Sequence, residues 1–278
     1  MDIKKLLEQV KITEPLVLCI TNFVTVNDCA NILLAIGATP TMSTHTGEIE
    51  EATSKALALV CNLGAIEHTE AMILAGKKAN ELQIPVILDP VAAGITELRR
   101  ETIKQLLEEV HFTAIRGNAS EIKAIAGVNT VGKGVDASDE DMVSEDTLEK
   151  DIRLFKELAR EIQSVIAVSG EIDVITDGIH TLLIRNGCKT MARITGSGCM
   201  LTTLIGAFCG ANREQAFEAT ALAVGVMGIA GENAEEKRIK NKTGNATFRT
   251  DLIDAVFNIT TEEIKEKMNY EIFEGTNS

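Results

Sequence analysis

The chain has 278 residues, of which 45% are hydrophobic and only 3% are aromatic. This length and composition are sufficient for a large aliphatic core and are compatible with one α/β domain. The formal net charge of -14 argues against nucleic acid or anionic membranes as partners, because both require basic patches.

The six cysteines include no C-x-x-C pair, so neither a zinc ribbon nor a thioredoxin-like motif is expected. Apart from Cys199, they are interpreted as reduced, buried thiols of a cytosolic protein. Residues 1–15 lack the apolar region of a signal peptide, and no apolar stretch is long enough to span a membrane. We therefore expect a cytoplasmic protein without a membrane partner.

Short apolar runs alternate with helical patterns along the chain. Five runs are continuously apolar, which is expected of parallel strands covered on both faces: residues 16–21, 56–63, 85–90, 112–117 and 164–170. Segments 173–178 and 180–187 predict a hairpin that turns near Asp177 and Gly178 and closes one edge of the sheet.

Helices are predicted between these strands. The segment 25–38 has capping residues at Thr25 and Asn27 and a stop at Gly37, and 147–163 has apolar residues at helical spacing. Residues 68–83 are amphipathic, and the chain from Met200 onward is almost entirely helical in pattern.

No repeat, low-complexity linker or composition shift divides residues 1–278. We therefore predict a single α/β domain with three αβα layers, a mostly parallel central sheet and an edge hairpin. The acidic segment 136–146 is interpreted as a solvated connection rather than a metal site.

Polar and glycine residues follow the predicted strands. They include Asn22, Gly64, Asp89, the segment 116–121 and Glu171. Ligands of parallel sheets bind at the carboxyl edge of the strands, so these residues are expected to converge on one site.

The segment "TGSGC", residues 195–199, is a glycine-rich turn that opens a helix. Free backbone N–H groups and the helix dipole favour an anion here, and glycine lets the backbone approach a phosphate closely. This predicts a phosphate-type anion site at Gly196, Ser197 and Gly198. The alternative is an ordinary helix start, and the Walker A pattern with its lysine is absent.

Two acidic positions have open interpretations. Asn118 and Glu121 lie one turn apart and could hold a hydrated Mg²⁺, or they could form an N-cap with an acidic first turn. Asp89 ends a strand before a proline, so it could complete the acidic cluster or cap the next turn.

The four histidines are scattered without metal-ligand spacing, and no G-x-S-x-G nucleophile motif is present. An anion site, an acidic metal site and a candidate base at one sheet edge instead indicate Mg²⁺-assisted phosphoryl transfer.

Several segments, in the same order as in that family, resemble the hydroxyethylthiazole kinase family, thiamine-salvage enzymes of the ribokinase-like superfamily. They are residues 20–43, 87–94, 116–122, 168–178 and 195–201. The resemblance covers nearly the whole chain. It implies a ribokinase-like fold and ATP-dependent phosphorylation of the primary alcohol of 4-methyl-5-(2-hydroxyethyl)thiazole in thiamine biosynthesis.

The resemblance also implies residue roles. Thiazole-binding positions are Asn22, Val24, Met42 and Gly196. ATP-binding positions are Arg116, Asn118 and Ser169, while Asp89 and Glu121 lie near Mg²⁺ and the phosphates. Cys199 stands where related kinases carry an aspartate base, and a helix N-terminus is expected to lower its pKa.

The family resemblance further implies a homotrimer with active sites between subunits, in which Asn22, Val24 and Met42 face a neighbouring chain. Three alternatives remain at this point. They are a related kinase for hydroxymethylpyrimidine or pyridoxal, an ATP-dependent lyase that repairs hydrated NAD(P)H, and a non-catalytic nucleotide sensor.

Overall fold

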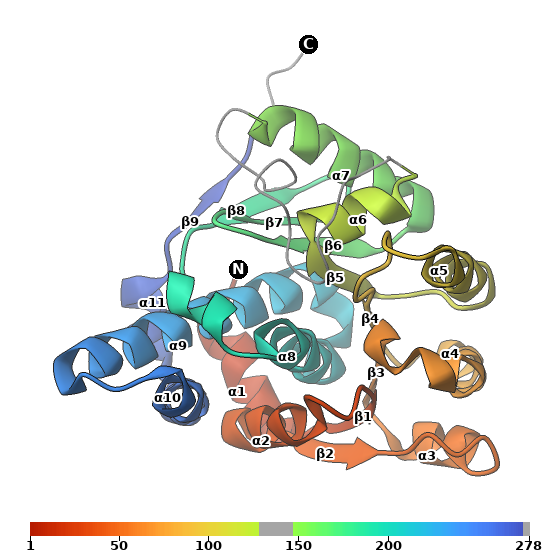
Figure 1. Ribbon diagram of the computed structural model, residues 1–278, viewed down its shortest axis with the longest axis horizontal. Coiled ribbons are helices and arrows are strands. Elements are labelled where there is room, and N and C mark those ends of the chain that lie inside the picture. Colours follow the sequence, from red (N-terminus) through yellow and green to blue (C-terminus); the bar gives the residue numbers. More distant parts are fainter. Residues whose placement is uncertain (128–146, 275–278) are drawn as a thin grey trace.

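The computed structural model describes residues 1–127 and 147–274. A nine-stranded sheet runs through them in the order β2-β1-β3-β4-β5-β6-β7-β8-β9 (Figure 1). The strands are β1 (Leu16–Ile20), β2 (Thr39–Met42), β3 (Ala58–Asn62), β4 (Val86–Asp89), β5 (Ala114–Asn118), β6 (Val165–Ser169), β7 (Asp173–Thr176), β8 (Thr181–Ile184) and β9 (Tyr270–Ile272).

The pairs from β2 through β6 are parallel, while β6 to β9 are joined by antiparallel pairs. The five predicted parallel strands are confirmed, with ends that differ by no more than two residues. The hairpin is also present as β7 and β8. Its predicted position at the sheet edge is wrong, because β9 pairs with β8 and forms that edge.

The opposite edge strand, β2, was not predicted. It carries the short sequence Thr-Pro-Thr-Met, which has neither an apolar run nor β-branched residues throughout. Pro40 lacks an N–H, and an edge strand tolerates this because one of its sides has no ladder partner. The strand therefore forms through pairing with β1 rather than through its own pattern.

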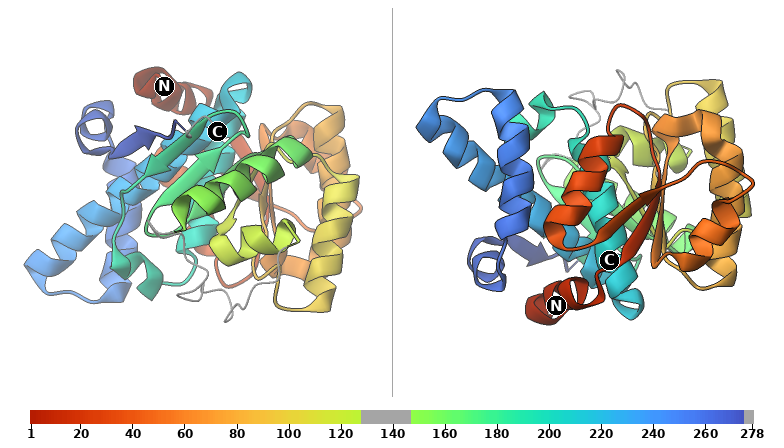
Figure 2. Two further views of the ribbon diagram at one scale, coloured as in Figure 1. Left: turned by 90° about the horizontal axis from the view of Figure 1, so that it is seen from above. Right: turned by 90° about the horizontal axis from the view of Figure 1, so that it is seen from below.

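Helices cover both faces of the sheet and make three layers (Figure 2). One face is covered by α1 (Ile3–Thr13), α2 (Val26–Ile36), α8 (Ser197–Ala211), α9 (Ala216–Asn241), α10 (Asn245–Asn258) and α11 (Thr261–Lys267). The other face is covered by α3 (Ile49–Lys55), α4 (Thr69–Glu81), α5 (Glu97–Glu109), α6 (Ala119–Ile125) and α7 (Leu148–Ile162). The predicted αβα layering is confirmed.

The two cores explain why the strands are apolar throughout. In β1, Val17 and Cys19 face the α8 side, while Leu18 and Ile20 face the α4 side. Because a strand alternates its side chains, a sheet buried on both faces needs apolar residues at every position.

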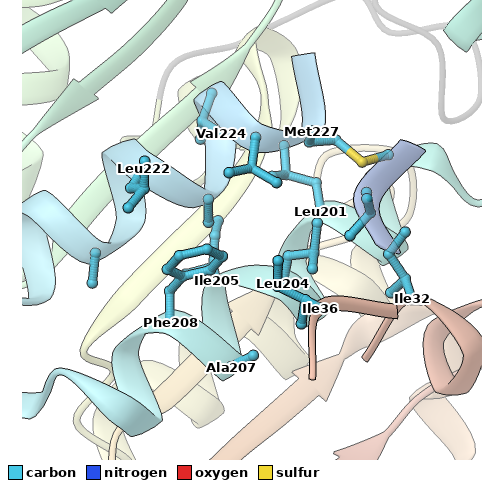
Figure 3. Packing of buried hydrophobic residues seen from close by; sticks show 14 of the residues in the cluster. Ile32, Ile36, Leu201, Leu204, Ile205, Ala207, Phe208, Leu222, Val224 and Met227 are labelled. Carbon is cyan, nitrogen blue, oxygen red and sulfur yellow. The ribbon is translucent and has the colours of Figure 1, made fainter. Parts of the chain in front are cut away.

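Helix α8 lies at the centre of the first core. Leu201, Leu204, Ile205 and Phe208 are fully or nearly fully buried and pack with residues of α2 and α9 (Figure 3). A helix that is apolar all round must be surrounded by protein, so α8 is held against the sheet along its length. The N-terminus of α8 is thereby fixed at the carboxyl ends of the parallel strands.

Helix α2 shows one local difference from prediction. Thr25 occupies its N-cap position, but the Thr25 side chain makes no capping hydrogen bond, and Asn27 lies inside the helix. Gly37 ends the helix in the left-handed conformation, as predicted. None of the helices in residues 1–127 and 147–274 combines the length and apolar character needed to span a bilayer.

Candidate active site

The carboxyl ends of β3 and β4 present two polar side chains to α8. Asn62 shares a strand face with Val60, and Asp89 shares one with Ile87, so both belong to the α8 side of the sheet. The strands pair Asn62 directly with Asp89, and the two residues are only 1% exposed. Asp89 therefore lies beneath the start of α8, at the carboxyl end of its strand as predicted.

Arg116 and Ser169 lie on the neighbouring strands β5 and β6. Arg116 Nε donates a hydrogen bond of 3.0 Å to Ser169 Oγ. A Cβ atom at Gly198 would overlap the Arg116 guanidinium, so this cation lies directly against the first turn of α8. The absence of a side chain at Gly198 is what permits this contact.

The turn before α8 has the properties expected of an anion site. Gly196 is the N-cap with φ of 83°, a left-handed conformation that favours glycine. No side chain caps the helix, and the first described intrahelical bond is Met200 N to Gly196 O at 2.8 Å. The N–H groups of Ser197, Gly198 and Cys199 precede that bond and face the end of the helix.

The Cys199 sulfur, on this first turn, is bonded by two side-chain amides. Asn62 Nδ2 lies 3.2 Å and Asn22 Nδ2 lies 3.6 Å from Cys199 Sγ. Asn22 follows β1, so residues from the two ends of the sequence meet at one sulfur. Asn22 thus contacts Cys199 of its own chain. Its predicted role in a site shared between subunits stays a prediction.

The sequence-based expectation for the thiol pKa is wrong. Burial, the nearby Asp89 charge and the Cys29 thiol raise the pKa of Cys199 to about 12, although Thr25 and Asn62 act in the opposite direction. The loss of solvation and the nearby carboxylate outweigh the hydrogen bonds that lower this pKa. Cys199 is therefore a neutral thiol at neutral pH in the ligand-free protein.

Asp89 is held by donors on both sides. Asn62 Nδ2 and Thr202 Oγ1 donate to Asp89 Oδ2 over 2.8 and 3.0 Å. Burial raises the pKa of Asp89, while the Arg116 charge and hydrogen bonds from Thr202, Cys199 and Asn62 counteract the rise. These contacts show that Asp89 does more than cap the following turn.

Asn118 and Glu121 form the capping interaction that was one of the two interpretations. Asn118 Oδ1 accepts from Glu121 N at 2.9 Å, and Glu121 Oε2 accepts from Asn118 N at 2.8 Å. Glu121 Oε1 also accepts from Ala92 N at 2.8 Å. Burial and the charge of Asp89 raise the pKa of Glu121 to about 7.

Asp89 and Glu121 fit a Mg²⁺ ion that keeps its water shell better than a Mg²⁺ ion bound directly by both carboxylates. Each Glu121 oxygen already accepts a backbone N–H, and no group of three metal-ligating side chains occurs among the described residues. Mg²⁺ keeps several waters and accepts ligation by few carboxylates. The mutual charge repulsion that raises the pKa of Glu121 is also a feature that a cation would relieve.

A pocket of about 440 Å³ opens beside the carboxyl ends of β1 and β2. Met42, Phe23, Val26, His45 and His68 are among its lining residues. Its wall also includes Thr21, whose Oγ1 is buried without a hydrogen-bond partner among the described residues. The pocket has the size and mixed lining of a small-molecule site.

The predicted thiazole-binding residues are divided between two environments. Met42 lines this pocket, while Asn22 points to Cys199. Val24 lies two residues beyond Asn22 and is 56% exposed. Within one chain, Val24 is thus open to solvent.

Sequence reasoning missed Asn62 and Thr202. Asn62 was counted within the apolar run 56–63, and only the following Gly64 was treated as the strand end. A single polar residue at the end of a buried run was the available signal. Thr202 lies three residues beyond Cys199, one turn along α8, and this spacing indicated a shared helix face.

The remaining predicted features lie away from Cys199. His180 pairs with Asp177 at 2.9 Å in the hairpin turn, and His111 is exposed after α5. All six cysteines are free thiols, but the expectation of burial is wrong for Cys188, which is only half-buried. The acidic segment 136–146 lies outside the described residues.

Comparison with known proteins gives a consistent result. The model of the hydroxyethylthiazole kinase family matches residues 7–262. A relative from Clostridium acetobutylicum, named hydroxyethylthiazole kinase, is 46% identical over 273 residues, which cover 98% of this chain and 100% of the relative.

Solved structures extend the comparison. Hydroxyethylthiazole kinase protein from Pyrococcus horikoshii OT3 has a TM-score of 0.84 and 33% identity, covering 98% of this chain and 99% of that chain. Bacillus subtilis pyridoxal kinase has a TM-score of 0.58 at 17% identity, over 78% of this chain and 91% of that one. The second likeness concerns the fold alone, and it agrees with the ribokinase-like architecture.

Proposed function

The chain belongs to the hydroxyethylthiazole kinase family, and we propose that its site transfers the γ-phosphoryl group of ATP to the primary alcohol of hydroxyethylthiazole. The observation that carries this proposal is the juxtaposition at the N-terminus of α8. There an uncapped glycine turn, the Arg116 guanidinium and the Cys199–Asp89 pair lie together. The alternatives of a different vitamin kinase, a lyase or a nucleotide sensor have no comparable support.

The turn and Arg116 supply the charge stabilisation. The N–H groups of Ser197, Gly198 and Cys199 and the positive end of α8 face the charge that spreads over the transferring group. Arg116, with Ser169 fixing its Nε, carries a full positive charge at the same place, and Asn118 lies at the adjoining strand end. We assign ATP contacts to these three residues and catalytic contacts to the turn.

Asp89 and Glu121 would hold Mg²⁺, mainly through its water shell. When bound, the ion neutralises charge on the phosphate oxygens and so favours transfer. The protein keeps these two carboxylates in place by hydrogen bonds from Asn62, Thr202 and backbone N–H groups.

Cys199 receives the alcohol proton late in the transfer. As a neutral thiol it can accept that proton only when its own S–H proton leaves. The Asp89 carboxylate, to which the thiol hydrogen-bonds, is the nearby acceptor. The proton of the alcohol thus reaches sulfur while the thiol proton reaches Asp89, and the O–P bond to the alcohol forms as the bond to ADP breaks.

We further propose a cytoplasmic homotrimer in which residues 1–278 act as one domain. Six free thiols suit a reducing compartment. The exposed Val24 and the pocket-lining Met42 would complete the thiazole site of a neighbouring copy. If so, mixing inactive Met42→Arg and Cys199→Ala variants restores activity in hybrid oligomers, whereas a site within one chain gives no restoration.

The direct test is ADP release with hydroxyethylthiazole, compared with hydroxymethylpyrimidine, pyridoxal and hydrated NADH. We expect turnover with the thiazole and little with the others. No response to the thiazole would overturn the proposal, and NADH formation from hydrated NADH would favour the lyase instead. A Cys199→Asp variant tests the proton-acceptor role, since a carboxylate at this position retains activity if that role is correct.

A further inference from the structure

We propose that Asn62 is a positioning residue that fixes the Cys199 sulfur relative to the Asp89 carboxylate at the N-terminus of α8. This inference rests on the proposed function, because it concerns how the same site orients the sulfur that receives the alcohol proton. It adds a residue that acts through two others.

The Asn62 side-chain amide bridges the two groups directly. Asn62 Nδ2 lies 2.8 Å from Asp89 Oδ2 and 3.2 Å from Cys199 Sγ. A primary amide has two N–H bonds, so it can donate one to each acceptor. The Asn62 amide therefore bonds both groups, in addition to the hydrogen bond between the thiol and the carboxylate themselves.

The amide is fixed in one orientation by its oxygen. Asn62 Oδ1 accepts from Gly64 N at 2.8 Å and from Asn22 Nδ2 at 3.2 Å. A flipped amide would place its oxygen against the Asp89 carboxylate and its NH₂ group against the Gly64 N–H. Both contacts would be repulsive, so the network assigns the donors to Cys199 and Asp89.

This orientation has a structural consequence. The two N–H bonds of Asn62 point at acceptors on different elements, Asp89 of β4 and Cys199 of α8, so the amide sets the position of the sulfur relative to the carboxylate. Because Asn62 is 1% exposed, water does not replace these donors readily.

Two variants separate positioning from folding. Asn62→Ala removes the donors, and Asn62→Asp keeps the acceptor for Gly64 N while replacing the NH₂ group by an oxygen. Asn212→Ala is the matched control, because Asn212 is also buried and its Nδ2 bonds Leu6 O and Phe208 O at the far end of α8. All are assayed for ADP release with hydroxyethylthiazole at pH 8, at varied ATP concentration, with thermal melting of each.

We expect both Asn62 variants to lose roughly 10- to 100-fold in kcat at pH 8, the loss typical of hydrogen bonds to charged groups. The KM for ATP should change by less than about threefold, because Asn62 lies outside the proposed ATP contacts. Asn212→Ala should keep its kcat despite a lower melting temperature.

The split between kcat and KM is the distinguishing readout. Loss of the Asn62 donors releases the Cys199 sulfur from its fixed position, which lowers kcat and leaves the KM for ATP nearly unchanged. A side chain needed only for folding lowers the melting temperature, as Asn212→Ala does, without a selective loss of kcat.

Two results would overturn the inference while wild type remains active. One is kcat within twofold of wild type in both Asn62 variants, and the other is an increase in the KM for ATP at least as large as the loss in kcat. If Asn62→Ala fails to fold, the isosteric Asp variant still carries the test. Inactivity of wild type towards the thiazole would instead contradict the proposed function.

Discussion

Helix α8 carries a cysteine near each end, and the two thiols are surrounded very differently. Cys199 accepts from the side-chain amides of Asn22 and Asn62 and lies beside Asp89. Cys209 is completely buried, with Thr220 Oγ1 at 3.7 Å and the Ala216 carbonyl as its polar neighbours.

Burial raises the pKa of both thiols to about 12. A raised pKa therefore does not distinguish a functional cysteine from a structural one. What distinguishes them is the set of donors and charges around the sulfur, which at Cys199 can stabilise negative charge and receive a proton. Cys199, at the N-terminal end of α8, thus lies in a polar site, whereas Cys209, at the other end, contributes to packing.

The largest expected effect comes from removing each thiol by substitution with alanine. We expect Cys199→Ala to lower kcat about 10²- to 10³-fold, within the range of lost proton-transfer catalysis. Cys209→Ala should leave kcat within about twofold and lower the melting temperature, because it opens a small cavity. Steady-state ADP release and thermal melting measure both, and equal kcat losses would remove the contrast.

Alkylation tests the protonation state of the two thiols. With a pKa of about 12, each is almost wholly protonated at pH 8, so iodoacetamide should react at least about 100-fold more slowly than with an ordinary cysteine. The rate at Cys199 should increase towards pH 10 as thiolate forms. Mass spectrometry of peptides follows it, with denatured protein as the reference, and rapid labelling of Cys199 at pH 7 would contradict the raised pKa.

Glycine substitution compares the two ends through backbone space. Gly198→Ala places a methyl group against the Arg116 guanidinium, and we expect kcat/KM for ATP to fall about 10-fold through a displaced cation. Gly210→Ala meets Ala58 and the Leu57 backbone instead, so it should cost stability and spare turnover. Unchanged ATP kinetics in Gly198→Ala would place Arg116 outside the ATP site.

The smallest effect separates two adjacent threonines. Thr202→Val removes a donor to Asp89, which raises the pKa of Asp89, whereas Thr203 donates to the Cys199 carbonyl within the helix. If ionised Asp89 is required, the acid limb of kcat moves to higher pH in Thr202→Val, with a loss of about threefold at pH 6. Thr203→Val serves as the control, and an unmoved limb in Thr202→Val would argue against this use of Asp89.

The sequence was most informative where one physical rule applied locally. Continuous apolar runs located the parallel strands, and the ends of these runs located Asp89, because parallel strands end at a common edge. Ser169 was identified only through the family resemblance. The glycine turn before α8 was recognisable because its conformation demands glycine at position 196.

The parts that were missed depend on tertiary structure. β2 and β9 gain their strand conformation from pairing with β1 and β8. The pKa of Cys199 depends on burial and on Asp89, more than 100 residues away in the sequence, and its helix position alone gave the wrong direction. Asn62 acts through atoms of β4 and α8, which no local pattern could bring together.

The bond between Asn22 and Cys199 joins residues 177 positions apart, and it has a consequence for biosynthesis. Helices α8 and α9 emerge from the ribosome only after all the strands except β9. At roughly 5–20 residues per second, the preceding chain takes on the order of ten seconds or more to make. Until α8 and α9 have been made, the sheet face that holds Asn62 and Asp89 lacks these two helices, so the nascent chain exposes apolar surface that chaperones can recognise.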